Sequence, residues 1–163
     1  MTPKDLAAYA DDIYKATAHL LRMAPEERWT YRPAEGNWMS LGQLARHLTD
    51  ATGVGLRGFI TSDWGPPPED GEMMPTAEKM PLCTKDEALR ALEDDRLLMH
   101  EMLDSLPAEE FSHRTVSAPW GGERPLWYYC LQMVEHQIAH RMQLFQYLKQ
   151  LGLPVTTNDL YGG

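Results

Sequence analysis

Apolar side chains recur every three to four residues along four stretches of the chain, which is the pattern of helices that each bury one face. The first stretch begins at Thr2 and Pro3, a hydroxyl N-cap followed by proline at the first helical position, and Pro25 closes it. Its apolar stripe comprises Leu6, Ala10, Ile13, Thr17 and Leu20. The pattern predicts a helix between Pro3 and Pro25.

A second helix is predicted from a capping box, in which Ser40 is followed three residues later by Gln43. The apolar stripe that follows runs to about Thr61 and comprises Leu41, Leu44, Leu48, Ala51, Gly55 and Phe59. Three glycines, at positions 53, 55 and 58, each weaken a helix by about 1 kcal/mol relative to alanine. We therefore expect either a close approach of backbone or ligand at these glycines, or a frayed helix.

The third and fourth helices have clear boundaries in the sequence. Thr84 and Glu87 form another capping box, and an apolar stripe continues to about Leu106. The fourth helix is predicted from Pro125 to about Leu151, where glycine and then proline at position 154 prevent its continuation.

The connections contain little helical pattern. "SDWGPPPEDGEMMPTAEKMP" (residues 62–81) holds five prolines, and loops of this length are usually functional or disordered. "RTVSAPW", before the Gly121–Gly122 turn, is compatible with a short strand of a hairpin between the third and fourth helices. Four helices without a convincing sheet predict an all-α four-helix bundle with long connections, formed by residues 1–163 as one domain.

Composition excludes several classes of protein. The formal net charge is −9, from 24 acidic and 15 basic residues, and no Lys/Arg run could follow a phosphate backbone, so we expect no nucleic-acid partner. The two cysteines, Cys83 and Cys130, form no disulfide framework. The sequence has no pattern of a secretory signal. Its apolar runs are much shorter than the roughly 20 residues that span a bilayer, so we expect a cytoplasmic protein without a membrane partner.

Two histidines lie one turn apart in the predicted fourth helix. At about 100° per residue, His136 and His140 are separated by about 40° around the helix axis, so their rings can converge on one point. They share their side of the helix with apolar residues, namely Tyr129, Met133, Leu144 and Tyr147. The pair is therefore expected to face the bundle.

A third histidine faces the same interior. His47 lies between Leu44 and Leu48 in the stripe of the predicted second helix. Three imidazoles from two helices could together bind one ion, and neutral imidazole suits Zn, Ni, Fe and Cu. Three protein nitrogens leave a coordination position open, which is the arrangement of catalytic sites. The ordinary alternative is that each histidine is a hydrogen-bonded core residue.

Other metal sites fit the sequence less well. A ferritin-like two-metal bundle needs E-x-x-H on two helices, and the only example, Glu110 to His113, lies in a connection. A zincin needs H-E-x-x-H, whereas position 137 is glutamine. His19 and His100 lie off the centres of their helical stripes, and we expect both at the surface.

Three segments resemble the DinB/YfiT-like superfamily: "WTYRPAEGNW", "WMSLGQLARHLTDA" and "APWGGERPLWYYCLQMVEHQIAHRMQLFQYLKQLGLP". Together they cover nearly half of the chain and include a Pro-Trp-Gly loop before the last helix. The resemblance implies a four-helix bundle in which three histidines bind a divalent metal, here His47, His136 and His140. The chain departs from the family pattern at Ala139 and Met142, which are not ligand positions but alter the pocket wall.

Known members of that superfamily include thiol S-transferases that use bacillithiol, mycothiol or glutathione, and a mycothiol-dependent maleylpyruvate isomerase. The resemblance therefore implies a metal-dependent transferase with Zn or Ni, or else Fe or Mn, together with a low-molecular-weight thiol and a small-molecule substrate; it also allows a homodimer. We expect the Pro-rich loop and Trp120, Tyr129, Met133 and Asp50 at the pocket. A metal-dependent hydrolase using the same site, and a non-catalytic metal-binding or scaffold protein, remain alternatives.

Overall fold

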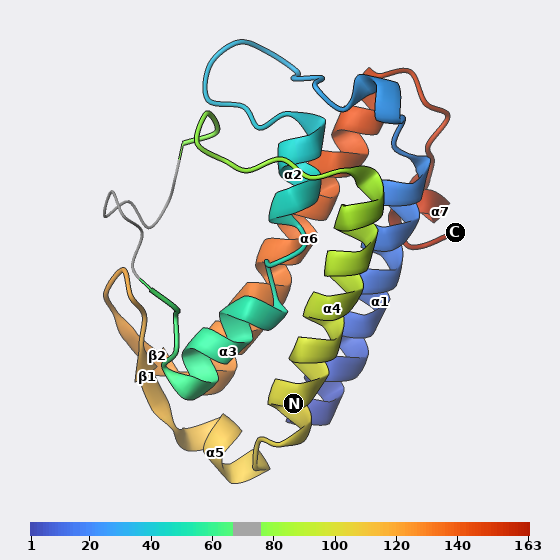
Figure 1. The fold of residues 1–163 in the computed structure, drawn as a ribbon. Coiled ribbons are helices and arrows are strands. Elements are labelled where there is room, and N and C mark those ends of the chain that lie inside the picture. The colour runs from blue at the N-terminus through green and yellow to red at the C-terminus, as the bar shows by residue number, and fades with distance from the viewer. Residues whose placement is uncertain (67–75) are drawn as a thin grey trace.

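Four helical segments form the bundle in the computed structural model, which describes residues 1–66 and 76–163. They are α1 (Pro3–Met23), the pair α2 (Leu41–His47) and α3 (Gly53–Thr61), α4 (Lys85–Asp104) and α6 (Leu126–Gln150). Figure 1 shows α1 beside α4, with α2 and α3 lying along α6. The predicted all-α bundle is confirmed, and its helices begin at the predicted N-cap Thr2 and at the predicted capping boxes of Ser40 and Thr84.

Short elements lie at the two ends of the bundle. A 3-10 turn, η1 (Glu26–Arg28), follows α1, and α7 (Thr157–Leu160) follows α6. Between α4 and α6, a short helix α5 (Ala108–His113) leads into an antiparallel hairpin of β1 (Thr115–Ser117) and β2 (Glu123–Pro125). The hairpin predicted from "RTVSAPW" is therefore present, and α5 occupies part of what the sequence indicated as a plain connection.

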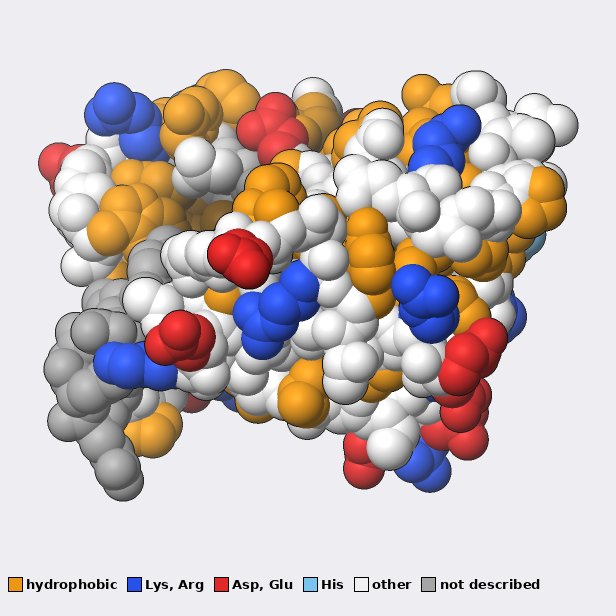
Figure 2. Space-filling model, turned by 90° about the horizontal axis from the view of Figure 1, so that it is seen from above, with side chains coloured by type: hydrophobic (Ala, Val, Ile, Leu, Met, Phe, Trp, Pro, Cys, Tyr) orange, Lys and Arg blue, Asp and Glu red, His pale blue; other side chains and the backbone are white. Residues whose placement is uncertain are grey.

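One apolar core runs the length of the bundle. Its fully buried members come from every long helix, for example Leu6 and Leu20 of α1, Leu44 of α2, Met99 of α4 and Leu148 of α6. Across the described residues, no helix is both long and apolar enough to cross a membrane. Figure 2, a view onto the end of the bundle, shows Lys and Arg side chains scattered among acidic and apolar ones.

The second predicted helix is broken. The expectation of one helix from Ser40 to about Thr61 is wrong, because α2 ends at His47 and α3 begins only at Gly53. Thr52, the N-cap of α3, makes no side-chain cap to its own helix. The free backbone N–H groups at the start of α3 need an acceptor from elsewhere in the fold.

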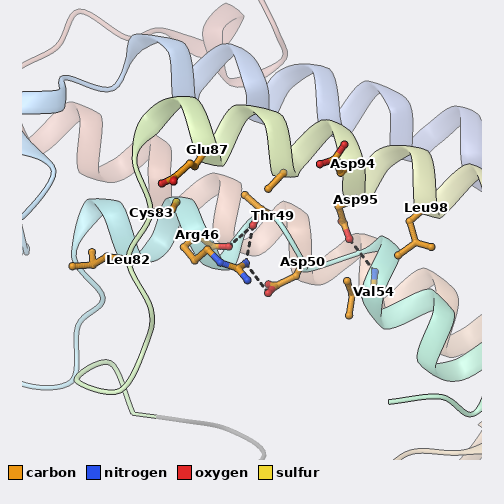
Figure 3. A pocket seen from close by; sticks show the side chains of 11 residues that line it. Arg46, Thr49, Asp50, Val54, Leu82, Cys83, Glu87, Asp94, Asp95 and Leu98 are labelled. Atoms are coloured by element: carbon orange, nitrogen blue, oxygen red, sulfur yellow. Dashed lines mark hydrogen bonds and ion pairs between the residues drawn. The ribbon is translucent and has the colours of Figure 1, made fainter. Parts of the chain in front are cut away.

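Asp95 of α4 supplies that acceptor. Its carboxylate accepts hydrogen bonds from the backbone N–H groups of Thr52 (3.3 Å), Gly53 (3.0 Å) and Val54 (2.9 Å). The hydroxyl of Tyr14 on α1 donates a fourth, at 2.6 Å. A side chain on α4 therefore caps α3 and ties three helices together, and the negative charge lies where a helix N-terminus favours it. Figure 3 shows Asp95 on α4 pointing to the start of α3, with its hydrogen bond from Val54.

The glycines of α3 permit close packing, which is one of the two outcomes that the sequence left open. A Cβ at Gly53 would overlap the backbone carbonyl oxygen of Asp95, and one at Gly55 would overlap the thioether of Met133. A Cβ at Gly58 would overlap the indole ring of Trp64. These glycines weaken the helix, but they allow α4, α6 and the loop after α3 to pack closely against it.

The C-terminal residues return along α1. Asp159 of α7 lies 2.9 Å from the Nε2 atom of His19, and Gly162 packs against Ala16. The ring of Tyr161 covers the buried guanidinium of Arg141 on α6, with 5.8 Å between the guanidinium carbon and the ring centre. This segment therefore packs on α1 and α6, and none of these contacts involves the site described next.

Candidate metal centre

Three histidines meet between α2 and α6. The Nε2 atoms of His47 and His136 lie 3.1 Å apart. The ring centres are separated by 5.0 Å for His47 and His136, 4.4 Å for His47 and His140, and 4.6 Å for His136 and His140. One nitrogen from each ring lies within 4.8 Å of the others, a spacing at which the three could hold a metal ion.

Local structure explains why these rings converge. His136 and His140 are one turn apart on α6, so their side chains project from the same face. His47 is the last residue of α2, immediately before the break, and Leu44 and Leu48 on either side of it are fully buried. The buried leucines orient α2 so that the third imidazole points at α6.

The environment keeps the three imidazoles neutral. Burial, followed by the neighbouring charges of His140, His136 and Arg46, lowers the pKa of His47 to about 3. Burial and His140 lower the pKa of His136 to about 4, and burial also lowers the pKa of His140. Each ring therefore carries a free lone pair near neutral pH, which is the form that binds metal.

A chain of hydrogen bonds orients His140. The hydroxyl of Tyr147 donates to the carbonyl oxygen of Met39 (2.9 Å) and accepts from the amide nitrogen of Gln143 (3.1 Å). This leaves the amide oxygen of Gln143 facing the Nδ1 atom of His140, 2.9 Å away. That oxygen can only accept, so Nδ1 carries the proton and Nε2 presents its lone pair to the cluster.

The sequence did not identify Gln143 in this role, although its i+3 spacing from His140 places both on one face of α6. Asp50 and Glu135, the carboxylates that lie near the histidines in sequence, do not orient them. Asp50 forms an ion pair with Arg46 at 2.8 Å, as Figure 3 shows. Glu135 is exposed.

Two pockets reach the cluster. The smaller, of about 280 Å³, contacts all three histidines and is also lined by Asn37, Met39, Ala77 and Met80. The larger, of about 660 Å³, contacts His136 and lies between α3, α6 and the hairpin turn. A ligand group bound at the three nitrogens is therefore accessible from outside the bundle.

The expected pocket residues divide into two groups. Asp50, Trp120 and Met133 line the larger pocket. Tyr129 is buried behind it, where its ring stacks on Phe59 at 4.4 Å and its hydroxyl donates to the carbonyl oxygen of Gly122. Residues 67–75 of the expected Pro-rich wall lie outside the described part of the chain, whereas Ala77 and Met80 of the same segment line the smaller pocket.

The remaining histidines lie elsewhere. The Nε2 atom of His100 is 2.9 Å from Asp11, and His19 pairs with Asp159 at the C-terminus. His113 is exposed on α5. Among the described residues, His47, His136 and His140 form the only group of three potential metal ligands close enough to share an ion.

The donor set fits a borderline divalent ion. Three neutral nitrogens suit Zn²⁺ or Ni²⁺ better than hard ions such as Mg²⁺ or Ca²⁺, which prefer oxygen ligands. No carboxylate completes the set within the described residues. Three protein ligands with pocket access on one side are the arrangement that leaves a position for a small molecule.

Comparisons with known proteins agree with this architecture. A family model described as the DinB superfamily matches residues 9–144. A DinB-like protein from Bacillus cereus ATCC 10987 is 19% identical, with 94% of this chain and 95% of that chain covered and a TM-score of 0.72. The DinB-like protein YjoA from Bacillus subtilis is 18% identical, with 93% and 96% covered and a TM-score of 0.68. No match was found among curated proteins.

Proposed function

The chain belongs to the DinB superfamily, and from this premise we propose that it is a metal-dependent enzyme that joins a low-molecular-weight thiol to an electrophilic small molecule. The observation that carries the proposal is the set of three neutral imidazoles, which share one point and open onto two pockets. Because Gln143 is the one described residue outside the cluster that hydrogen-bonds to it, the cluster is suited to an external ligand.

The roles of the residues follow from their contacts. His47, His136 and His140 would hold the ion, and Gln143 holds the Nδ1 proton of His140 so that Nε2 faces the cluster. A divalent ion bound there would supply Lewis-acid chemistry, lowering the pKa of a coordinated thiol or water. Met39, Met80 and Ala77 provide apolar walls beside the histidines, which would limit access of water to a thiol bound there.

The proposed reaction forms a bond between the thiol sulfur and an electrophilic carbon of the acceptor. The leaving group departs with the electron pair of its bond to that carbon, and the thiol proton passes to solvent. No oxidant or reductant is needed.

The test uses protein loaded with Zn²⁺ or Ni²⁺, with glutathione, bacillithiol or mycothiol as donor and 1-chloro-2,4-dinitrobenzene as acceptor. We expect conjugate formation above the uncatalysed rate, with loss of the excess in His136→Ala. His100→Ala is the matched control, because His100 contacts Asp11 and lies outside the cluster. Equal turnover in wild type and His136→Ala would refute the role of the metal. Release of p-nitrophenol from p-nitrophenyl acetate without any thiol would favour a hydrolase instead.

A further inference from the structure

The larger pocket has an aromatic wall built on α3. The rings of Trp64 and Trp120 each meet the ring of Phe59 edge-on, with ring centres 4.7 Å and 5.8 Å from it. Phe59 is in turn stacked on Tyr129. The indole of Trp64 packs against Gly58, and any side chain at position 58 would occupy the space of this ring.

Both tryptophans remain available to a ligand. Trp64 is 37% exposed and Trp120 is 49% exposed, and their ring centres are 6.3 Å apart. Indole rings at this spacing offer flat apolar surfaces and also attract cations through their π faces. Met133 adds a polarisable thioether to the same pocket.

The charged side chains that line this pocket are all acidic. Asp50 and Glu135 line it, and no Lys or Arg does so among the described residues. Arg46 partly offsets Asp50 through their ion pair, whereas the exposed Glu135 forms no ion pair with another residue of the described ranges 1–66 and 76–163. In the metal-free protein an anionic ligand would therefore face uncompensated carboxylate charge, and the formal net charge of the protein is −9.

We infer that this pocket binds the acceptor of the reaction and selects flat, apolar molecules that are neutral or cationic, while rejecting anions. Its position supports the assignment, since this pocket contacts His136 and a second, smaller pocket contacts all three histidines. The thiol and the acceptor would thus occupy different pockets. Naming the ligand as acceptor rests on the proposed function, but the selectivity of the pocket does not.

Three probes with the same two-ring frame test the selectivity: 2-naphthol, the cation N-methylquinolinium and the anion 2-naphthoate. Each is titrated into ¹⁵N-labelled full-length protein, both metal-free and Zn²⁺-loaded, while the five indole N–H resonances are followed by NMR. We expect the Trp64 and Trp120 resonances to shift with 2-naphthol and N-methylquinolinium. Binding of 2-naphthoate to the metal-free protein at low salt should be weaker by about fivefold, as expected for one charge contact at a solvent-exposed site.

Matched variants separate the pocket from the rest of the surface. Trp120→Ala should weaken 2-naphthol binding, whereas Trp127→Ala should not, because Trp127 is 38% exposed but lies outside this pocket. Glu135→Lys should narrow or reverse the discrimination against 2-naphthoate. Glu101→Lys, an exposed change on α4, should leave it unchanged.

The inference is overturned if 2-naphthoate binds as tightly as 2-naphthol, or if only the indoles of Trp29, Trp38 and Trp127 respond. It is supported if the predicted ranking appears in wild type and persists in His47→Ala, where metal binding is expected to be lost. That ranking together with an absence of thiol conjugation would uphold the selectivity of the pocket while contradicting the proposed reaction. The two claims therefore fail separately.

Discussion

The bundle contains two polar clusters that differ in how completely the protein satisfies their hydrogen bonds. Asp95 is 3% exposed and accepts four hydrogen bonds, three from the backbone of α3 and one from Tyr14. The three imidazoles are half-buried, and within the described residues Gln143 is the one group outside the cluster that hydrogen-bonds to any of them. The first cluster is complete without a ligand, whereas the second has a single hydrogen bond to the described residues outside it.

The difference follows from the cost of burying each kind of group. A carboxylate is tolerated in a core when donors surround it, and even so burial raises the pKa of Asp95 above its ordinary value. Imidazole can lose its proton and become neutral, so it can be buried with fewer partners. Asp95 therefore holds the helices in place, and the histidines are free to bind something that comes from outside.

The largest predicted effect is on the Asp95 cluster. Asp95→Ala leaves three backbone N–H groups at the start of α3 and the Tyr14 hydroxyl without their acceptor. We expect the free energy of unfolding to fall by about 3 kcal/mol or more, because each buried donor left unsatisfied costs about 1–3 kcal/mol. Urea unfolding followed by circular dichroism measures the loss.

Asp94→Ala is the control, since Asp94 is the exposed neighbour on the same helix. It should change the free energy of unfolding by less than about 0.5 kcal/mol. A similar urea midpoint of unfolding for Asp95→Ala and Asp94→Ala would show that the Asp95 cap of α3 does not stabilise the fold. The proposed difference between the Asp95 cluster and the histidine cluster would then be wrong.

The next prediction concerns addition of a metal ion. Zn²⁺ at 100 times its dissociation constant should stabilise the native state by about 2.7 kcal/mol, if the unfolded chain does not bind it. For a chain of this size the shift in melting temperature is about 5–10 °C. His136→Ala should lose the shift and His100→Ala should keep it. An equal shift in all three proteins would mean that Zn²⁺ binds elsewhere.

Two glycines of α3, Gly53 and Gly55, test how the Asp95 region differs from a more adaptable contact in the same helix. In Gly53→Ala the new methyl group meets the backbone of Asp95, which cannot move without shifting α4, so we expect a loss of about 2 kcal/mol. In Gly55→Ala it meets the thioether of Met133, which can rotate away, and the gain in helix propensity of about 1 kcal/mol offsets part of the cost. Thermal or urea unfolding of both variants should rank Gly53→Ala as the less stable. The reverse order would contradict this account of the helix break.

The smallest predicted effect comes from Tyr14→Phe. This change removes one of the four donors to Asp95 and keeps the ring, so the free energy of unfolding should fall by about 1 kcal/mol, the usual net contribution of one hydrogen bond. Combined with Asp95→Ala in a double-mutant cycle, its effect should largely disappear. Full additivity of the two changes would mean that the hydroxyl does not act through the carboxylate.

Features encoded by nearby residues could be predicted from the sequence. The N-cap Thr2 before Pro3 and the capping boxes at Ser40 and Thr84 predicted the helix starts, because each signal lies within four consecutive residues. The convergence of His136 and His140 follows from their spacing in one helix. The inward orientation of His47 follows from the apolar residues on either side of it.

Features that depend on distant residues could not be predicted. The break before Gly53 requires the carboxylate of Asp95, which is more than forty positions away along the chain and carries no local signal of its role. The placement of Tyr129 behind the pocket depends on its stacking with Phe59, a contact between α6 and α3. The position of Gln143 beside His140 was predictable in principle, but nothing in the sequence distinguishes it from other polar residues on that helix.

The central claim is that His47, His136 and His140 bind one metal ion together, and elemental analysis of purified protein after Zn²⁺ loading and desalting tests it most directly. The account predicts one Zn²⁺ per wild-type chain and per His100→Ala chain, and close to none in His47→Ala and His136→Ala. Equal zinc content in His136→Ala and wild type, with both proteins folded, would contradict it.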